Sequence, residues 1–176
     1  MSRPVAITGV GAVTPLGVHA PALVEGWAAS RSGIADGLAR CADFEPGDHL
    51  SVKEVRRADR FTQLALVAGG EALEQAGLEG AVAPEDVGCV IGTGIGGIGT
   101  IEDQHDVLRD RGAGAISSLA VPLMMANAAS GVIAMKHGLK GQCYGTVSAC
   151  AAGAHAIGAG LRMVQHGDAE ACVVGG

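Results

Sequence analysis

The stretch QCYGTVSACAAG, residues 142–153, joins a strand-forming run to a run of small residues. The pattern of residues 142–147 favours a strand, and that of residues 151–165 favours a helix. Cys150 falls at the junction between them. A strand that leads directly into a helix is typical of a mostly parallel sheet, because the chain must cross back before the next strand runs in the same direction.

The same alternation of strands and helices extends over the rest of the chain. We expect further strands at residues 5–13, 87–91 and 171–176, and helices at about 20–30, 61–76, 101–111 and 122–137. Gly77 is expected to end the second of these helices, and residues 31–50, rich in Gly, Asp and Pro, to form a surface excursion. The pattern predicts an α/β fold with helices on both faces of a mostly parallel sheet.

Composition narrows the possible classes of protein. The 176 residues are enough for one domain, and with 48% hydrophobic but only 2% aromatic residues its core must be mainly aliphatic. A net charge of −6 argues against general binding of nucleic acid. The most apolar long stretch, residues 119–135, is too short and too interrupted to span a membrane.

Cysteine usage and the two ends of the chain suggest a compartment. The five cysteines form no CxxC pair, which argues against a metal site, and they are Cys41, Cys89, Cys143, Cys150 and Cys172. Their odd number and the lack of a secretory signal predict a reducing, cytoplasmic setting. The chain also stops where its last strand stops, which we interpret as a truncation.

Cys150 has two interpretations from its position alone. A thiol acts as a nucleophile only as the thiolate, and the start of the helix at residue 151 would supply positive potential for it. The alternative is a small buried hydrophobic residue, which is what most free cysteines are. For the other four cysteines, three in strand-like runs and Cys41 in a loop, we prefer the second interpretation.

The motif TVSACAAG, residues 146–153, resembles the nucleophile motif of the condensing enzymes called β-ketoacyl-acyl-carrier-protein synthases I and II. Three more segments resemble this family in the same order, namely residues 5–17, 92–99 and 168–176. The resemblance implies a thiolase-like, layered αβαβα fold made of two similar halves. Residues 1–176 would be the N-terminal half-domain, with the C-terminal half absent.

The resemblance also implies a reaction, that of a 3-oxoacyl-[acyl-carrier-protein] synthase in fatty acid or polyketide synthesis. Cys150 would accept an acyl group as a thioester, and decarboxylated malonyl-carrier protein would attack it. No bound cofactor is implied, because the substrates travel on the phosphopantetheine of acyl carrier protein. The family's two catalytic histidines, its lysine and its second oxyanion-hole amide lie in the other half, so we expect no condensation by this chain alone. His155 is assigned packing or a hydrogen bond rather than catalysis.

Family resemblance assigns three residues to the acyl pocket. Ile95, in the glycine-rich loop, aligns with a residue that lines the acyl tunnel, and Ala120 and Val121 lie in a segment that reaches toward the partner subunit's pocket. Ordinary core positions are the alternative for all three. The resemblance further implies a homodimer, or a ketosynthase heterodimer, formed through the helix at 122–137 and the strand at 142–147.

A basic cluster is a candidate docking surface for the acidic acyl carrier protein. Its members follow one another at helical spacing, and they are Lys53, Arg56, Arg57 and Arg60. One helix would gather them on one face, where they could attract an acidic partner. The alternative is a solvated face on which Glu54 and Asp59 pair with these bases.

Rival functions remain open at this point. Gly92, Gly94 and Gly97 fit a dinucleotide-binding fingerprint, but the acidic residue expected about twenty positions later is missing. The chain could also be a non-catalytic partner subunit of a polyketide synthase, although such subunits typically lack the cysteine. An inert fragment that serves only as an interaction piece is the third rival.

Overall fold

The computed structural model describes residues 3–78 and 80–176, and its centre is a sheet of three parallel strands in the order β4–β3–β5. These strands are β3 (Val87–Thr93), β4 (Cys143–Val147) and β5 (Ala171–Gly175). The register aligns Thr93 with Val147 and Ile91 with Gly175. All three strands therefore end at the same edge of the sheet, from which the next loops begin.

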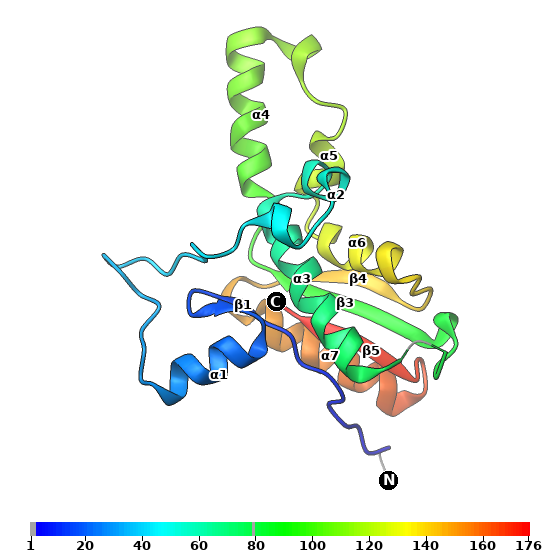
Figure 1. Cartoon of the computed structure of the whole chain (residues 1–176). Helices are drawn as coiled ribbons and strands as arrows, with labels where there is room; N and C mark the ends of the chain where they lie inside the picture. Colours follow the sequence, from blue (N-terminus) through cyan, green and yellow to red (C-terminus); the bar gives the residue numbers. More distant parts are fainter. Residues whose placement is uncertain (1–2, 79) are drawn as a thin grey trace.

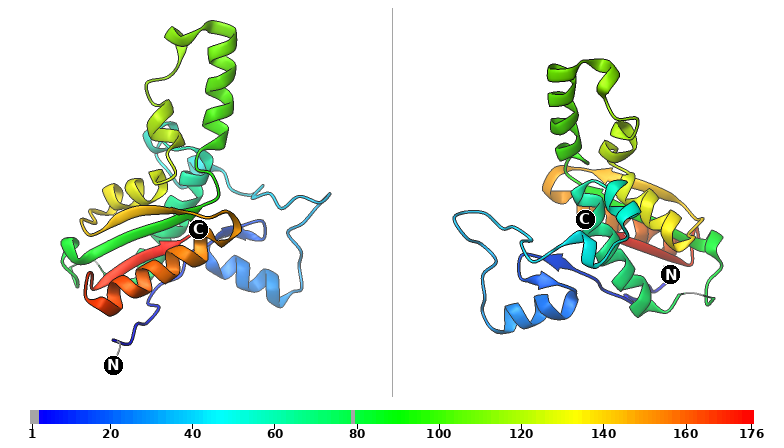
Figure 2. Two further views of the ribbon diagram at one scale, coloured as in Figure 1. Left: turned by 180° about the vertical axis from the view of Figure 1, so that it is seen from behind. Right: turned by 45° about the horizontal axis from the view of Figure 1, so that its top comes forward.

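Helices cover both faces of this sheet (Figures 1 and 2). The helices α3 (Arg60–Ala76) and α6 (Ala128–His137) share one core with β3, whereas α7 (Ala152–His166) shares another. Side chains alternate along β3 accordingly, since Cys89 and Ile91 belong to the first core and Val90 to the second. The predicted α/β architecture is confirmed.

The remaining elements surround this layered body. They are β1 (Val13–Thr14), β2 (Gly17–Val18), α1 (Ala20–Ala28), α2 (Val52–Arg56), α4 (Ile98–Arg111), α5 (Ala120–Met124) and four 3₁₀ turns at Pro46–Asp48, Pro84–Asp86, Ala113–Ala115 and Ala149–Ala151. The segment from α4 to α5 projects from the body as an arm (Figure 1). Helices predicted at 20–30, 61–76 and 101–111 are confirmed to within three residues, and Gly77 ends α3 with a φ of 60°. Within the described ranges, no helix has the length and apolar character that crossing a membrane requires.

Ser130 fastens α6 to the sheet. Its buried hydroxyl accepts a hydrogen bond from the Ile91 N–H at 2.9 Å and donates one to the Tyr144 carbonyl at 2.8 Å. One side chain thereby satisfies backbone groups of both β3 and β4, groups that would be costly to leave unpaired in the interior.

The predicted strand at residues 5–13 is wrong except at its end. Only Val13–Thr14 forms a strand, as half of a small hairpin with Gly17–Val18, and Ile7 is 89% exposed. Residues 3–9 instead line a cavity of about 590 Å³ together with parts of α3, α7 and β5. The segment is therefore separated from the sheet that its composition suits.

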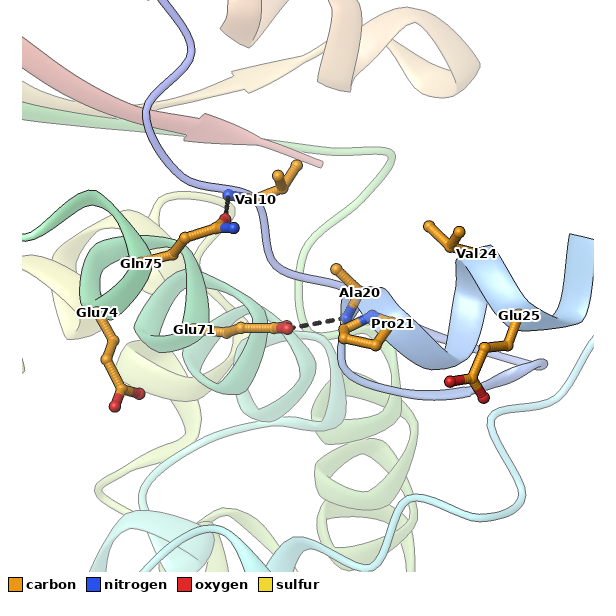
Figure 3. Close-up of a pocket in the computed structure, with 8 residues that line it drawn as sticks. All are labelled: Val10, Ala20, Pro21, Val24, Glu25, Glu71, Glu74 and Gln75. Atoms are coloured by element: carbon orange, nitrogen blue, oxygen red, sulfur yellow. Dashed lines mark hydrogen bonds between the residues drawn. The ribbon is translucent and has the colours of Figure 1, made fainter. Parts of the chain in front are cut away.

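Contacts with α3 explain where this segment lies (Figure 3). The N–H groups of Val10 and Ala12 donate to the side chains of Gln75 and Glu71 at 2.6 Å and 3.0 Å, and Glu71 also accepts from the Ala20 N–H at 2.9 Å. Gly9 and Gly11 lie so close to α3 that a Cβ at either would be 1.9 Å from a helix carbonyl oxygen. Side-chain acceptors on α3 thus replace a neighbouring strand. A second cavity, of about 600 Å³, is lined by Val10, Ala20, Glu71 and Gln75 among others, and its lining includes none of the predicted site residues.

The predicted helix at 122–137 is also corrected, because it is two helices. α5 ends at Met124, Met125 is extended with a ψ of 134°, and α6 begins at Ala128. The break passes over the glycine loop, where a Cβ on Gly96 would be 2.7 Å from the Met124 carbonyl oxygen. Close packing against that loop sets the path of residues 125–127.

Glu54 connects α2 to α6. It completes a capping box with Ser51 and forms an ion pair with Lys136 at 2.8 Å. The hydrogen bonds from Lys136 and Ser51 lower the pKa of Glu54 to about 2. The folded state therefore favours the charged carboxylate.

We predict that Glu54→Gln lowers the thermal midpoint at neutral pH, because the amide keeps the cap but loses the ion pair. The difference from the parent should shrink as the pH falls from 4.5 to about 2, because Glu54 takes up its proton below pH 4.5 in the unfolded chain but only near pH 2 in the folded one. Thermal unfolding followed by circular dichroism across this range measures the effect. Glu74→Gln, at an exposed site of α3, is the control, and a difference that persists at the lowest pH would contradict the assignment.

Candidate active site

Cys150 lies at the carboxyl edge of the sheet, in the 3₁₀ turn between β4 and α7. It is exposed, and α7 begins two residues later. Ala149, immediately before it, has a φ of 49°, in the left-handed region that residues with a Cβ avoid. The predicted junction is therefore confirmed, and the turn that carries the thiol is a sharp one.

Two glycines let the backbones behind Cys150 converge. A Cβ on Gly92 of β3 would be 2.3 Å from the carbonyl group of Ala152, at the start of α7. A Cβ on Gly176 would be 2.7 Å from the Cα of Gly153 and 2.9 Å from the Gly92 carbonyl oxygen. The first turn of α7 can lie this close to β3 and to the end of β5 only because these side chains are absent.

The start of α7 favours an anion at the position of the thiol. Its first turn contains no acidic residue, and no side chain caps it. The backbone N–H groups of a first helical turn lack partners within the helix and carry the positive end of its dipole. A thiolate formed at Cys150 would lie next to these groups.

Two side-chain hydrogen bonds cross the turn. Thr146 Oγ1 donates to the carbonyl oxygen of Ala152 at 2.9 Å, and Ser148 Oγ lies 2.6 Å from His155 Nδ1. The hydrogen-bonding role predicted for His155 is confirmed. The sequence did not identify Ser148 as its partner. Thr146 and Ser148 are two residues apart, a spacing that places side chains on one face of an extended chain, and this was the signal that could have suggested Ser148.

The other cysteines occupy positions that suit inert thiols. Cys89, Cys143 and Cys172 lie on β3, β4 and β5, and Cys41 lies in a loop, as predicted. Burial raises the pKa of Cys89 and of Cys143, and it raises that of Cys172 to about 11. The thiolate form is therefore disfavoured at these three positions.

The three residues predicted to line the acyl pocket differ in exposure. Ala120 is buried, which fits the core alternative, whereas Ile95 and Val121 are each 60% exposed and do not belong to the core of this chain. The loop that holds Ile95 is tied to α5 by a hydrogen bond from the Gly97 N–H to the Met124 carbonyl at 3.1 Å. The absent side chains of Gly96 and Gly97 make room for the backbone of α5 rather than for open space.

The predicted basic face is corrected, because its residues do not share one helix. α2 ends at Arg56, Arg57 caps it, and α3 begins at Arg60. The Arg60 guanidinium donates to the carbonyls of Cys41 and Phe44, both at 3.1 Å, and lies 4.7 Å from the centre of the Phe44 ring. Arg60 therefore also holds a loop in place, while its side chain stays exposed.

All four bases are exposed, and they are Lys53, Arg56, Arg57 and Arg60. The alternative in which Glu54 and Asp59 pair with them is wrong. Glu54 pairs with Lys136, and Asp59 Oδ2 accepts from the N–H and hydroxyl of Thr100 at 2.9 Å and 2.6 Å. These bonds also join the α2–α3 junction to α4, the helix that follows the glycine loop.

The glycine loop does not lie in the structural context that dinucleotide binding requires. The loop does lie between a strand and a helix, β3 and α4, but the chain then passes through α5 and α6 before β4 begins. A dinucleotide fold needs a compact strand–helix–strand unit with an acidic residue at the end of its second strand.

Comparison with known proteins places this geometry among condensing enzymes. Residues 2–176 match the family model of the beta-ketoacyl synthase, N-terminal domain. The 3-oxoacyl-[acyl-carrier-protein] synthase 2 of Synechocystis is 39% identical over 98% of this chain and 44% of its own length. The protein of the same name from Coxiella burnetii is 37% identical over 99% of this chain and 45% of its own length. The chain thus spans less than half the length of these relatives.

Solved structures show the same fold. A complex of a type II PKS acyl-carrier protein with its ketosynthase contains a chain that matches with a TM-score of 0.84 and 25% identity, over 96% of this chain and 49% of that one. The ishigamide ketosynthase/chain length factor matches with a TM-score of 0.82 and 26% identity, over 96% of this chain and 46% of that one. The layered α/β fold expected from the sequence is confirmed.

We predict that Gly92→Ala destabilises the chain by about 1–3 kcal/mol, because the new methyl group collides with the backbone of Ala152. Gly94→Ala is the matched control, since a Cβ there would contact nothing within 4 Å, and it should shift stability by less than about 1 kcal/mol. Urea denaturation measures both variants. Equal losses in the two would contradict the close approach of β3 and α7.

Proposed function

Because this chain belongs to the β-ketoacyl synthase family, as its N-terminal domain, we propose that it supplies the acyl-accepting nucleophile of a 3-oxoacyl-[acyl-carrier-protein] synthase. The observation that carries the proposal is the exposed thiol of Cys150 on a sharp turn at the uncapped start of α7. The three cysteines of the sheet, whose thiols have raised pKa values, are unsuited to that role.

The first half of the proposed reaction uses residues of this chain. The sulfur of Cys150 attacks the thioester carbonyl of an acyl group carried on phosphopantetheine. A new carbon–sulfur bond forms, the bond to the carrier sulfur breaks, and the proton of the Cys150 thiol leaves with the carrier thiol. Splitting acyl transfer through such a covalent intermediate lowers the barrier of each step.

The second half of the reaction is assigned to other residues. Malonyl-carrier protein loses carbon dioxide, and its carbanion attacks the acyl-cysteine to give a 3-oxoacyl product and free Cys150. The two histidines and the lysine that the family uses for this step are expected beyond residue 176, because this chain spans 44% to 45% of the relatives described above. No bound cofactor is part of the proposal.

We also propose that two ketosynthase chains pair about a two-fold axis and that the protein is cytoplasmic. The outer edge of β4 carries no partner strand among residues 3–78 and 80–176, and its ends at Cys143 and Val147 are exposed. A second strand could therefore add to this edge. The added strand could come from a second copy of this chain or from a related chain. The presence of Cys150 indicates that this chain is the catalytic member of such a pair.

We predict that the chain accepts an acyl group at Cys150 but does not elongate it. Incubation with an acyl-pantetheine thioester should add one acyl mass, located at Cys150 by peptide mass spectrometry, and Cys150→Ala should abolish the adduct. Addition of malonyl-carrier protein should yield no 3-oxoacyl product. Labelling spread over all five cysteines would indicate an inert fragment instead, and elongation by this chain alone would contradict the proposed division of residues.

Acyl carrier protein is the proposed partner, and Lys53, Arg56, Arg57 and Arg60 are its proposed docking surface. These bases are exposed, and the carboxylates of Glu54 and Asp59 make other contacts, so their positive charge is available to an acidic protein. The bonds between Asp59 and Thr100 join this surface to α4, which begins after the glycine loop at the carboxyl edge of the sheet.

We predict that Arg56→Glu and Arg57→Glu each weaken binding of acyl carrier protein by about fivefold or more at low salt, with a smaller effect at high salt, because the attraction of exposed charges is screened. Titration calorimetry at two salt concentrations measures the change. Arg31→Glu, an exposed site outside α2, is the control for net charge. Equal weakening in the control, or no salt dependence, would contradict a local docking surface.

A further inference from the structure

Ser148 and His155 lie on either side of Cys150 in the chain, and their side chains are hydrogen-bonded to each other. The distance from Ser148 Oγ to His155 Nδ1 is 2.6 Å. Ser148 follows the last residue of β4, and His155 is the fourth residue of α7. We propose that this pair holds the turn that bears Cys150 in the orientation needed for acyl transfer. The inference rests on the function proposed above.

The turn needs stabilising contacts, because the backbone conformation of Ala149 is unfavourable for a residue with a Cβ. Ala149 adopts a φ of 49°, and a residue with a Cβ gains by leaving that region. A change at Ala149 would rotate the peptide group that precedes Cys150 and re-aim its side chain. Contacts across the turn must oppose this change.

Three hydrogen bonds oppose a change of the Ala149 backbone, and they span different numbers of residues. The Ala151 N–H donates to the Ser148 carbonyl at 3.1 Å, which closes the turn locally. Thr146 Oγ1 bonds the carbonyl of Ala152, a buried residue at the inner side of α7. The bond from Ser148 to His155 extends farthest along the chain, over seven residues, and it reaches the exposed side of the helix.

The bond itself needs the hydroxyl and the ring nitrogen but not one particular proton position. Either the Ser148 hydroxyl donates to Nδ1, or Nδ1–H donates to the hydroxyl oxygen. Both arrangements fasten the end of β4 to α7. Ser148 and His155 are therefore positioning residues, which act on the reaction through the orientation of Cys150.

This role can be tested in the natural protein by comparing two reactions of Cys150. Acylation by an acyl-pantetheine thioester requires one direction of approach between sulfur and carbonyl, whereas alkylation by iodoacetamide tolerates many. We expect Ser148→Ala and His155→Ala to slow acylation about tenfold, and alkylation less than about twofold, because misplacement penalises the oriented reaction. Peptide mass spectrometry of Cys150 gives both rates.

Further variants separate positioning from a merely structural effect. Ser148→Thr keeps a hydroxyl and should retain most of the acylation rate. The double variant should be no slower than either single one, because both singles remove the same bond. His166→Ala, which changes an exposed histidine at the other end of α7, is the matched control and should leave both rates unchanged.

The possible results distinguish this proposal from the proposed function. Normal acylation in both alanine variants would overturn the positioning role and leave Cys150 as the nucleophile. A parallel fall in both reactions, together with a lower thermal midpoint, would also overturn it, since it would indicate general destabilisation. Absence of acylation at Cys150 in the parent protein would overturn the proposed function and this inference together.

Discussion

The closeness of α7 to β3 is the constraint on which the candidate active site depends. With a side chain at Gly92, the carbonyl of Ala152 could not occupy its present position, and the start of α7 would move away from the sheet. Cys150 lies two residues before that helix, so its position follows from the same contact. Gly153 and Gly176 extend the close packing to the end of β5. The absence of side chains at Gly92 and Gly176 therefore helps to place the one side chain that carries the proposed chemistry.

A second group of contacts arranges what surrounds the thiol. The glycine loop after β3 packs against the end of α5, which interrupts the helix that would otherwise continue into α6. Asp59 bonds Thr100 near the start of α4 and thereby links that loop to the junction of α2 and α3. The proposed docking bases and the proposed acyl-pocket residues are thus connected through short backbone and carboxylate contacts.

Exposure separates Cys150 from Cys89 and Cys172 of the sheet. Cys89 and Cys172 are held in or beside the core, where burial raises their pKa values and removes them from nucleophilic chemistry. Cys150 lies outside the sheet, exposed, two residues before the uncapped start of α7. The same residue type therefore packs in the core in one place and is the proposed nucleophile in another, according to its surroundings.

Much of the fold followed from local pattern. Buried runs with β-branched residues predicted β3, β4 and β5, and small-residue periodicity with a terminal glycine predicted α3. The junction at Cys150 was also predictable, since it depends on the boundary between two such patterns. The failures share a physical cause, which is competition from a distant part of the chain. Residues 5–12 have strand composition, but Glu71 and Gln75 of α3 bond their backbone instead.

The basic residues also show that local spacing alone does not predict contacts with distant parts of the chain. Helical spacing grouped Lys53, Arg56, Arg57 and Arg60, yet Arg60 starts a new helix and bonds the carbonyls of Cys41 and Phe44. By itself the sequence determined the layered α/β architecture, the nucleophile candidate and the family, because local periodicity and a contiguous motif encode them. Only the tertiary structure decided which groups Arg60 binds, where residues 5–12 lie and which partner His155 binds. The first two outcomes depend on groups far apart in the chain, and the third depends on a hydrogen bond across the turn that bears Cys150.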